Sequence, residues 1–336
     1  MSRIAVIGAG AWGTGLSIVL GRKGIHNVRL WAREPEVRQA ISSKRINELF
    51  LPGQVVPENL SVTGDITEAL LDAEIVVSVM PSQHCRNLFQ QMVPHLKSET
   101  LIVSATKGLE ETTLLRMTEV ISGTLEASRF KPRLGALSGP SFALEVARGD
   151  PTAVAIASTD DELAERIQRE FSDPRFRVYR NEDVIGVELG GALKNVIAIA
   201  AGVCHGLNFG HNSIAALITR GLAEMTRLVV ACGGRPETMS GLAGLGDLVL
   251  TCTGDLSRNR SVGVELGRGR KLAEIIAGMH GSVAEGIFTT NVALGLARTR
   301  SVEMPITEQM HAILHNDKPP RDAIHELMTR RATSES

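Results

Sequence analysis

The chain has 336 residues, of which 43% are hydrophobic and 22% charged, so it is long enough for two domains and a substantial core. Its formal net charge of -1 excludes the basic surplus that a nucleic-acid-binding protein needs. One of the longest apolar runs, Val196 to Val203, is far too short to cross a membrane. We therefore expect a globular protein with no nucleic-acid partner and no membrane span.

The first half of the chain alternates short apolar runs with helical patterns. Runs that are apolar throughout are typical of strands buried on both faces of a parallel sheet. We expect strands at Ile4–Ile7, Val28–Trp31, Ile75–Val79, Leu101–Ser104, Leu134–Leu137, Ala153–Ala157 and Phe176–Tyr179. The intervening helices include Trp12–Lys23, Glu36–Leu49, His84–Leu96 and Leu114–Leu125. This alternation predicts an α/β domain with a doubly wound sheet over residues 1–185.

The second half shows no strand pattern after Tyr179. Glycine-rich breaks at Gly233-Gly234 and Gly241–Gly246 separate its helical segments. We expect helices at Val184–His205, Ser213–Cys232, Lys271–Ala277, Thr289–Arg298, Pro305–His315 and Asp322–Met328. An all-α domain over residues 186–336 follows from this pattern.

A glycine-rich turn, Gly8-Ala9-Gly10-Ala11-Trp12-Gly13, joins the first strand to the first helix. The first glycine permits a tight turn, the second lets the backbone approach a pyrophosphate, and the third allows close helix–strand packing. The helix N-terminus then faces the phosphates. An ordinary strand–turn–helix joint is the alternative, but the strand before the turn and the helix after it favour a dinucleotide site.

The end of the second strand indicates which dinucleotide binds. In such folds a residue about 20 positions past the turn recognises the adenosine ribose. Here the strand ends at Trp31, which is not acidic, and Arg33 is placed to meet a 2′-phosphate. Glu34 is the opposing signal, because a shift of one residue would make it a ribose ligand. We expect NADP, NAD or both as cofactor, with NADPH favoured.

Lys194 is the candidate for chemistry beside the dinucleotide. Hydride transfer to a carbonyl needs a proton donor, and burial lowers the pKa of a lysine toward the working range. The helical neighbours of Lys194 are small, namely Gly190, Gly191, Ala198 and Ala201, and leave space around the ammonium group. A lysine that extends along the helix surface into solvent is the alternative.

Four other segments add polar groups of the kind that such a site needs. Asp247 lies among glycines and could orient a lysine, while Ser257-Arg258-Asn259 suits a phosphate group. Lys107 and the run 138–143 each follow a strand, where ligands of such sheets bind. Each alone is typical of an ordinary loop, but together they predict a dehydrogenase.

The motifs G-A-G-A-W-G-T, A-T-K-G-L-E, S-G-P-S-F-A, G-G-A-L-K-N, G-L-A-G-L-G-D-L and S-R-N-R occur in this order. The set resembles that of the bacterial NAD(P)-dependent glycerol-3-phosphate dehydrogenases, from Ile4 to about Met328. The resemblance implies a Rossmann-type domain, a helical second domain, and reversible reduction of dihydroxyacetone phosphate to sn-glycerol 3-phosphate for glycerophospholipid synthesis. Two departures are Ala11, where many relatives carry serine, and Gly15, where alanine is usual.

The resemblance also assigns roles to residues of this chain. It makes Lys194 the proton acceptor and Asp247 its acidic partner, with Lys107 as a third candidate in the catalytic set. Substrate contacts are implied for Lys107, Gly139, Ser141, Lys194, Asp247, Ser257, Arg258 and Asn259. Cofactor contacts are implied for Gly8, Gly10, Ala11, Trp12, Gly13, Arg33, Lys107, Ala143, Arg258, Val283 and Glu285.

Two other functions stay open on the residues alone. One is a dehydrogenase of β-hydroxyacids or ketopantoate, whose substrates carry a carboxylate that arginine also binds. The other is a non-catalytic NADP-binding protein. The spacing of His and Cys residues predicts no metal site. Four widely spaced cysteines indicate a reduced, cytoplasmic compartment, and base rates favour a homodimer.

Overall fold

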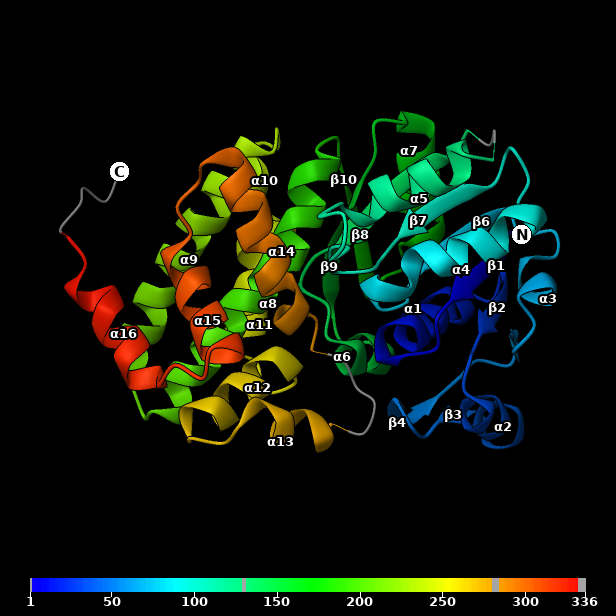
Figure 1. The fold of residues 1–336 in the computed structure, drawn as a ribbon. Coiled ribbons are helices and arrows are strands. Elements are labelled where there is room, and N and C mark those ends of the chain that lie inside the picture. Colours follow the sequence, from blue (N-terminus) through cyan, green and yellow to red (C-terminus); the bar gives the residue numbers. More distant parts are fainter. Residues whose placement is uncertain (1, 129–130, 280–283, 332–336) are drawn as a thin grey trace. The chain divides into compact units, whose positions relative to one another are not determined.

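The computed structural model describes residues 2–128, 131–279 and 284–331 (Figure 1). The chain divides into two compact units. Unit 1 comprises Met1–Glu110 and Leu115–Glu188, and unit 2 comprises Glu111–Leu114 and Leu189–Ser336. The main crossing from one unit to the other lies within a single helix, α8 (Val184–Gly206).

Unit 1 is built on an eight-stranded sheet, which confirms the predicted α/β class. Its order across the sheet is β10 (Phe176–Asn181), β9 (Thr152–Ala157), β8 (Arg133–Ser138), β7 (Leu101–Ser104), β6 (Ile75–Ser78), β1 (Arg3–Ile7), β2 (Asn27–Trp31) and β5 (Leu60–Thr63). The register pairs Ile7 with both Trp31 and Ser78, and Ser78 with Ser104. The carboxyl ends of these parallel strands therefore meet at one edge, where ligands of doubly wound sheets bind.

The sheet is mostly parallel, as predicted, but it contains one antiparallel pair. Strands β8 and β9 pair antiparallel, so β9 and β10 run against the rest. The helix between β8 and β9 is α6 (Ala143–Arg148), with six residues. Such a helix spans ~9 Å, whereas a strand of six residues spans ~20 Å, so α6 is too short to return the chain to the start of β8. An antiparallel return is the consequence.

Seven α-helices accompany the sheet in the described part of unit 1. They are α1 (Ala11–Arg22), α2 (Pro35–Lys44), α3 (Ile66–Leu70), α4 (Cys85–Met92), α5 (Met117–Glu126), α6 and α7 (Asp161–Phe171). Two predicted helices were too long. The first ends at Lys44 because Arg45 adopts a φ of 57°, and a short hairpin of β3 (Ile46–Asn47) and β4 (Leu51–Val55) follows. The second begins at Met117, after Leu114 with a φ of 61°.

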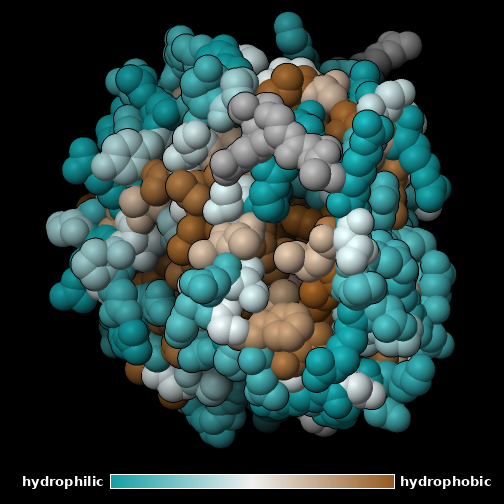
Figure 2. Space-filling model, turned by 90° about the vertical axis from the view of Figure 1, so that its left-hand side faces the viewer, coloured by the Kyte–Doolittle hydropathy of each residue, from teal (hydrophilic) through white to brown (hydrophobic). Residues whose placement is uncertain are grey.

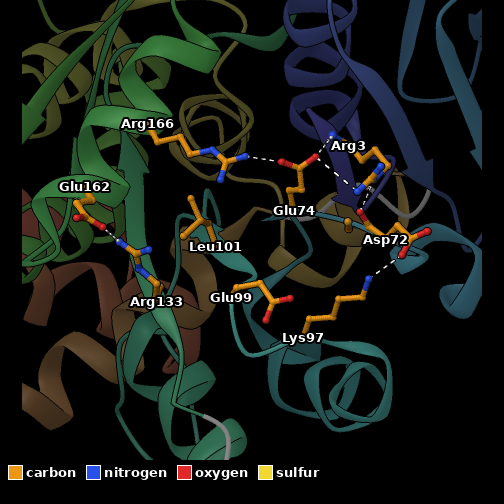
Figure 3. A pocket seen from close by; sticks show the side chains of 10 residues that line it. Arg3, Asp72, Glu74, Lys97, Glu99, Leu101, Arg133, Glu162 and Arg166 are labelled. Atoms are coloured by element: carbon orange, nitrogen blue, oxygen red, sulfur yellow. Dashed lines mark hydrogen bonds and ion pairs between the residues drawn. The ribbon is translucent and has the colours of Figure 1, made fainter. Parts of the chain in front are cut away.

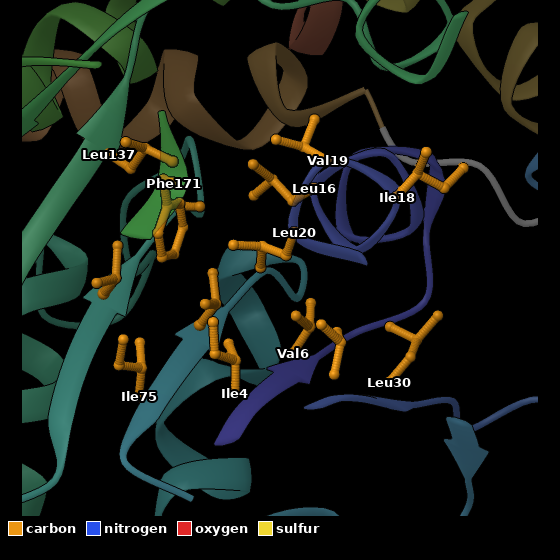
Figure 4. Close-up of a cluster of buried hydrophobic side chains, with 14 of the residues drawn as sticks. Ile4, Val6, Leu16, Ile18, Val19, Leu20, Leu30, Ile75, Leu137 and Phe171 are labelled. Carbon is orange, nitrogen blue, oxygen red and sulfur yellow. The ribbon is translucent and has the colours of Figure 1, made fainter. Parts of the chain in front are cut away.

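Apolar side chains cover both faces of the sheet, as the unbroken apolar runs predicted. Ile4 and Val6 belong to one buried cluster and Ala5 and Ile7 to another, because successive side chains of a strand point to opposite faces. Figure 4 shows the first cluster, in which Leu16 and other side chains of α1 lie over the strands. Helices α4 and α5 supply the second cluster. With both faces covered, the sheet offers ligands only its edges.

Charged side chains that form ion pairs line the amino edge of the sheet. A cavity of ≈ 390 Å³ is lined there by four basic and four acidic side chains, together with Ala73 and Leu101. Arg166 pairs with Glu74 at 2.6 Å, and Lys97 pairs with Asp72 at 2.6 Å (Figure 3). Equal numbers of the two charges leave no net attraction for an ion. The carboxyl edge is therefore the place for a ligand.

Unit 2 is helical throughout its described part, as predicted. Its helices are α8, α9 (His211–Ala231), α10 (Pro236–Met239), α11 (Asp247–Thr253), α12 (Arg258–Gly267), α13 (Leu272–Ala277), α14 (Glu285–Arg300), α15 (Pro305–His315) and α16 (Pro320–Thr329). The sequence interpretation missed α10, α11 and α12. It took Gly241–Gly246 as a break, but Leu242–Gly246 forms a π-helical turn that leads directly into α11.

Helix α8 is the one described helix whose length and composition would allow it to cross a membrane. It has 23 residues, close to the predicted Val184–His205, and a mean hydropathy of 1.6 over its most apolar window. However, 89% of that window is buried inside the protein. A helix that is apolar all round and buried in protein is a core helix, so α8 is the centre of unit 2.

Glycines hold α8 and α12 in direct backbone contact. A Cβ at Gly202 of α8 would lie 2.1 Å from the carbonyl oxygen of Arg260, and one at Gly263 of α12 would lie 2.0 Å from that of Ile199. One turn further on, Gly206 and Gly267 meet in the same way, with distances of 2.3 and 2.5 Å to the facing carbonyl oxygens. No side chain fits in this crossing, which fixes the spacing of the two helices.

We expect Gly263→Ala to lower the free energy of unfolding by ~1–3 kcal/mol, because the added methyl group must push the two helices apart. The matched control is Gly123→Ala in α5, where a Cβ would meet nothing within 4 Å. There the change should raise stability by ~0.5–1 kcal/mol, since alanine is the better helix former. Urea denaturation of the two variants measures both effects, and equal stability of the two would contradict the close crossing.

Candidate active site

The glycine turn has the geometry of a phosphate cradle. Gly8 adopts a φ of +121°, and a Cβ there would lie 2.6 Å from the carbonyl oxygen of Val79. A Cβ at Gly13 would lie 1.9 Å from the carbonyl oxygen of Gly8, whereas Gly10 has nothing within 4 Å. Gly10 is the N-cap of α1, which begins at Ala11 with backbone N–H groups that have no partner within the helix. The turn thus brings bare backbone and a helix N-terminus to one open place.

Trp12 and Lys107 lie together beside this turn. The Lys107 Nζ is 5.8 Å from the centroid of the Trp12 ring, a favourable cation–π distance. The indole Nε1 of Trp12 is buried and has no hydrogen-bond partner. A buried hydrogen-bond donor without a partner is uncommon in native proteins. Together with the open backbone at Gly10, it indicates that the residues present fit a dinucleotide.

Lys107 also links the carboxyl ends of two neighbouring strands. It follows β7, and its Nζ donates to the Gly139 carbonyl oxygen at 2.8 Å and to the Ser141 Oγ at 3.1 Å, both just after β8. Gly139 has a φ of +143°, and a Cβ there would lie 2.9 Å from Val154 Cα, so glycine is required. Ala143 begins α6, which packs on α1, and its carbonyl oxygen would lie 3.2 Å from a Cβ at position 15. Glycine at position 15 thus allows α1 and α6 to pack closely.

Arg33 and Glu34 follow the end of β2, as the sequence predicted. The Arg33 side chain is 69% exposed, and its Nη2 lies 3.0 Å from Glu34 Oε1. Glu34 is the N-cap residue of α2. The two residues that favour different cofactors are therefore paired with each other.

In unit 2 the structure brings together Lys194 and Asp247, which are 53 residues apart in the sequence. Both are buried, with side chains 6% and 1% exposed. The Lys194 Nζ donates to Asp247 Oδ1 and, at 2.9 Å, to the Thr251 hydroxyl. Thr251 in turn donates to the Asp247 backbone carbonyl at 2.6 Å. The ammonium group is thus held by a carboxylate and a hydroxyl from one face of α11.

Asn259 joins three helices next to this lysine. Its Nδ2 donates to the Oδ1 of Asn195 on α8 at 3.0 Å, and its Oδ1 accepts from the Gly286 N–H on α14 at 2.9 Å. A Cβ at Gly286 would lie 2.7 Å from the Asn195 carbonyl oxygen. Asn195 follows Lys194 directly, so the position of the lysine is linked to α12 and α14 through Asn259.

The other candidates of unit 2 lie at helix starts. Ser257 is the buried N-cap of α12, and its Oγ accepts from the Arg260 N–H at 3.2 Å. Arg258 and Glu285 are the first residues of α12 and α14, which the Asn259–Gly286 hydrogen bond ties together. Val283 lies outside the described residues. Anions are stabilised at helix N-termini, so the start of α12 suits a phosphate group.

Sequence reasoning missed Asn195 and Thr251. Asn195 stands in the quoted run with Lys194, but nothing in the pattern showed that Asn259 would reach it. Thr251 lies four residues after Asp247, a spacing that places both on one face of a helix. This spacing could have identified Thr251 only if α11 had been predicted. The sequence analysis did not predict α11, because it interpreted the preceding glycines as a break.

Neither thiol nor metal chemistry is indicated at this site. Burial raises the pKa of Cys252, the neighbour of Thr251, to about 12, so this thiol stays protonated and is no nucleophile. Within the described ranges, no three His, Cys, Asp or Glu side chains lie close enough to hold a metal ion.

A dinucleotide cradle on a doubly wound sheet, and a buried lysine–aspartate pair on a helical unit, define a dinucleotide-dependent dehydrogenase of two-unit construction. The family models for the N- and C-terminal parts of NAD-dependent glycerol-3-phosphate dehydrogenase match residues 3–164 and 183–325. The chain belongs to this family, which confirms the resemblance seen in its motifs.

Individual relatives match along their whole length. A protein of Koribacter versatilis named glycerol-3-phosphate dehydrogenase [NAD(P)+] is 68% identical over 335 residues, covering 100% of this chain and 99% of its own. One of the same name from Acidobacterium capsulatum is 56% identical, covering 98% of each. The crystal structure of glycerol-3-phosphate dehydrogenase from Coxiella burnetii is 42% identical, with a TM-score of 0.93 over 98% of this chain and 99% of that one.

We expect Lys194→Met to lower the free energy of unfolding by ~3–5 kcal/mol, because it leaves the buried Asp247 carboxylate without its cation. The double variant Lys194→Met, Asp247→Asn carries no buried charge at this place and should recover at least half of the loss. Urea denaturation at pH 7 measures both variants. A double variant no more stable than the single one would show that the pair contributes no electrostatic coupling.

Proposed function

We propose that this chain reduces dihydroxyacetone phosphate reversibly to sn-glycerol 3-phosphate with NADPH or NADH, and so supplies glycerophospholipid synthesis. The observation that carries the proposal is the buried Lys194, held by Asp247 and Thr251 in a unit that also presents the Ser257-Arg258-Asn259 triplet. The full-length relatives named glycerol-3-phosphate dehydrogenase [NAD(P)+] support the same assignment.

The glycine turn and its neighbours would hold the cofactor. Gly8, Gly10, Ala11 and Gly13 offer backbone to the pyrophosphate, and Trp12 offers its unpartnered indole N–H. The nicotinamide cofactor, when bound, supplies the hydride. Further contacts are proposed for Arg33, Lys107, Ala143, Arg258, Val283 and Glu285.

Lys194 would move the proton that the reaction requires. As the carbonyl carbon is reduced, the ammonium group gives a proton to the developing alkoxide; in the reverse direction the neutral amine takes it from the hydroxyl. Asp247 and Thr251 orient the amine, since each fixes one of its hydrogen bonds. The sequence predicted that Gly190 would leave space beside this lysine, but Gly190 instead packs on the turn before α11, since a Cβ there would lie 2.6 Å from the Ala243 carbonyl oxygen.

The phosphate group would be bound away from the reacting carbon. Arg258 supplies a guanidinium, and Ser257 and Asn259 supply a hydroxyl and an amide at the start of α12. Such remote binding fixes the carbonyl for attack and contributes to rate as well as affinity. We assign Lys107, Gly139 and Ser141 to the same substrate molecule, with Lys107 adding a second positive charge. The reacting oxygen and the phosphate would then each face a cation.

The alternatives differ in the anion that the substrate carries. A β-hydroxyacid or ketopantoate-type enzyme binds a carboxylate, whereas the triplet at α12 offers more donors than a carboxylate needs. A protein that only binds NADP has no use for a buried lysine–aspartate pair. Both alternatives remain outcomes of the following experiment.

We expect dihydroxyacetone phosphate to be reduced with NADPH and with NADH, and phosphate-free dihydroxyacetone to be inert, as followed by absorbance at 340 nm. Lys194→Arg retains a buried cation but cannot release its proton at neutral pH, so it should lower kcat by about 10²-fold or more and leave NADPH binding intact. Turnover only with a carboxylate-bearing ketone would favour the alternative enzymes. Full activity of Lys194→Arg would remove Lys194 from the proton transfer.

We also propose that the chain is a cytoplasmic homodimer. All four cysteines are free thiols, which suits a reducing compartment. Figure 2 shows a face, on the side of α9, α15 and α16 in Figure 1, where apolar side chains gather in a hollow among hydrophilic ones. Independently of that view, unit 2 exposes two large apolar side chains, Val230 of α9 at 48% and Val249 of α11 at 40%. Exposed apolar surface of this kind is typical of protein contacts, and twofold dimers are the commonest assembly.

Light scattering coupled to size-exclusion chromatography tests the dimer. We expect a mass twice the 36.0 kDa of the chain, independent of added cofactor. A mass of one chain at micromolar concentration would contradict the proposal.

A further inference from the structure

A second arginine lies at the carboxyl end of β2, and sequence reasoning did not single it out. Arg38 is in the first turns of α2, and its Nη1 donates to the carbonyl oxygens of Ala32 at 2.8 Å and Arg33 at 2.7 Å. These two carbonyls directly follow the last residue of β2, Trp31. The guanidinium of Arg38 therefore lies at the place where a doubly wound sheet receives the adenosine ribose.

The surroundings of Arg38 hold its guanidinium in place. A Cβ at Gly64 would lie 2.7 Å from Arg38 Cζ and 2.9 Å from its Nε, so the guanidinium packs on bare backbone. The Trp31 Nε1 fixes that backbone by donating to the Gly64 carbonyl at 3.0 Å. Within the described ranges, Nε and Nη2 of Arg38 make no hydrogen bond and no ion pair to the protein. The group is thus oriented, partly buried, and able to donate further.

Arg33 differs from Arg38 in its exposure and in its partner. Its side chain is 69% exposed, and its charge is already paired with Glu34. A 2′-phosphate must displace the Glu34 carboxylate to bind Arg33, and a flexible exposed side chain loses entropy on binding. Arg38 has no carboxylate to displace, and its geometry is set in advance.

We propose that Arg38 is a specificity-determining residue that holds the 2′-phosphate of NADPH together with Arg33, while Glu34 favours NADH. This inference rests on the proposed function, because it concerns the cofactor of the same site. A guanidinium binds a phosphate through parallel hydrogen bonds, which makes two oriented arginines a strong phosphate site. The Glu34 carboxylate repels that phosphate and can accept a hydrogen bond from the 2′-hydroxyl of NADH. The three residues together account for a site that accepts both cofactors.

The test measures binding of two nucleotides that differ only in the 2′-phosphate, namely adenosine 2′,5′-bisphosphate and AMP, by isothermal titration calorimetry. For Arg38→Ala we expect the affinity for the bisphosphate to fall about ten-fold or more, with less than about a two-fold change for AMP. Arg38→Lys keeps the charge but not the forked geometry, so its affinity for the bisphosphate should lie between those of the wild type and Arg38→Ala.

Arg29→Ala is the matched control for the structural role. Arg29, on β2, also donates through one Nη1 to two carbonyl oxygens, those of Glu68 at 3.0 Å and Leu71 at 2.6 Å. Its loss should leave the ratio of the two affinities unchanged. The proposal is overturned if Arg38→Ala weakens both nucleotides by the same factor, or neither. If the wild-type protein binds neither nucleotide, the dinucleotide site of the proposed function fails as well.

Discussion

The fold of unit 2 depends on the bare backbone of α8. Gly202 and Gly206 let α12 approach until carbonyl oxygens occupy the places of side chains, and a Cβ at Gly286 of α14 would lie 2.7 Å from the Asn195 carbonyl oxygen. Gly190 makes the same kind of contact with the π-helical turn before α11. Packed interiors cannot deform by small amounts without cost, so these contacts determine where the side chains of α8, α11, α12 and α14 can lie. The candidate active site is a consequence of this packing.

The buried charge of Lys194 requires partners, and this requirement explains the residues around it. An unpaired buried charge costs several kcal/mol, so Lys194 needs Asp247 and Thr251 as partners. The same partners orient its ammonium group for proton transfer. Stability and chemistry therefore place the same requirement on α11, and the π-helical turn before it is the local irregularity that brings Asp247 to the lysine. In the dinucleotide turn of unit 1, too, packing and function depend on the same residues, because its glycines allow both close packing and the approach of a ligand.

Much of the fold was predictable because its signals are local. The apolar runs of the first half, such as Ile4–Ile7 and Leu101–Ser104, became buried strands, and the long helices of unit 2 were found from their periodicity. The errors have physical causes that a local pattern does not contain. Arg45 and Leu114 end or delay helices through left-handed backbone, and the shortness of α6 reverses β9. Gly241–Gly246 was taken as a break, although Leu242–Gly246 forms a π-helical turn that leads into α11.

The sequence by itself determined the class of protein, because a glycine turn between a strand and a helix, and a lysine among small residues, are local patterns with a direct chemical meaning. Only the tertiary structure decided which side chains meet. The pairing of Lys194 with Asp247 and of Asn195 with Asn259 joins residues 53 and 64 positions apart, and Arg38 reaches the end of β2 from the following helix. Such contacts follow from how elements pack, which no residue spacing expresses.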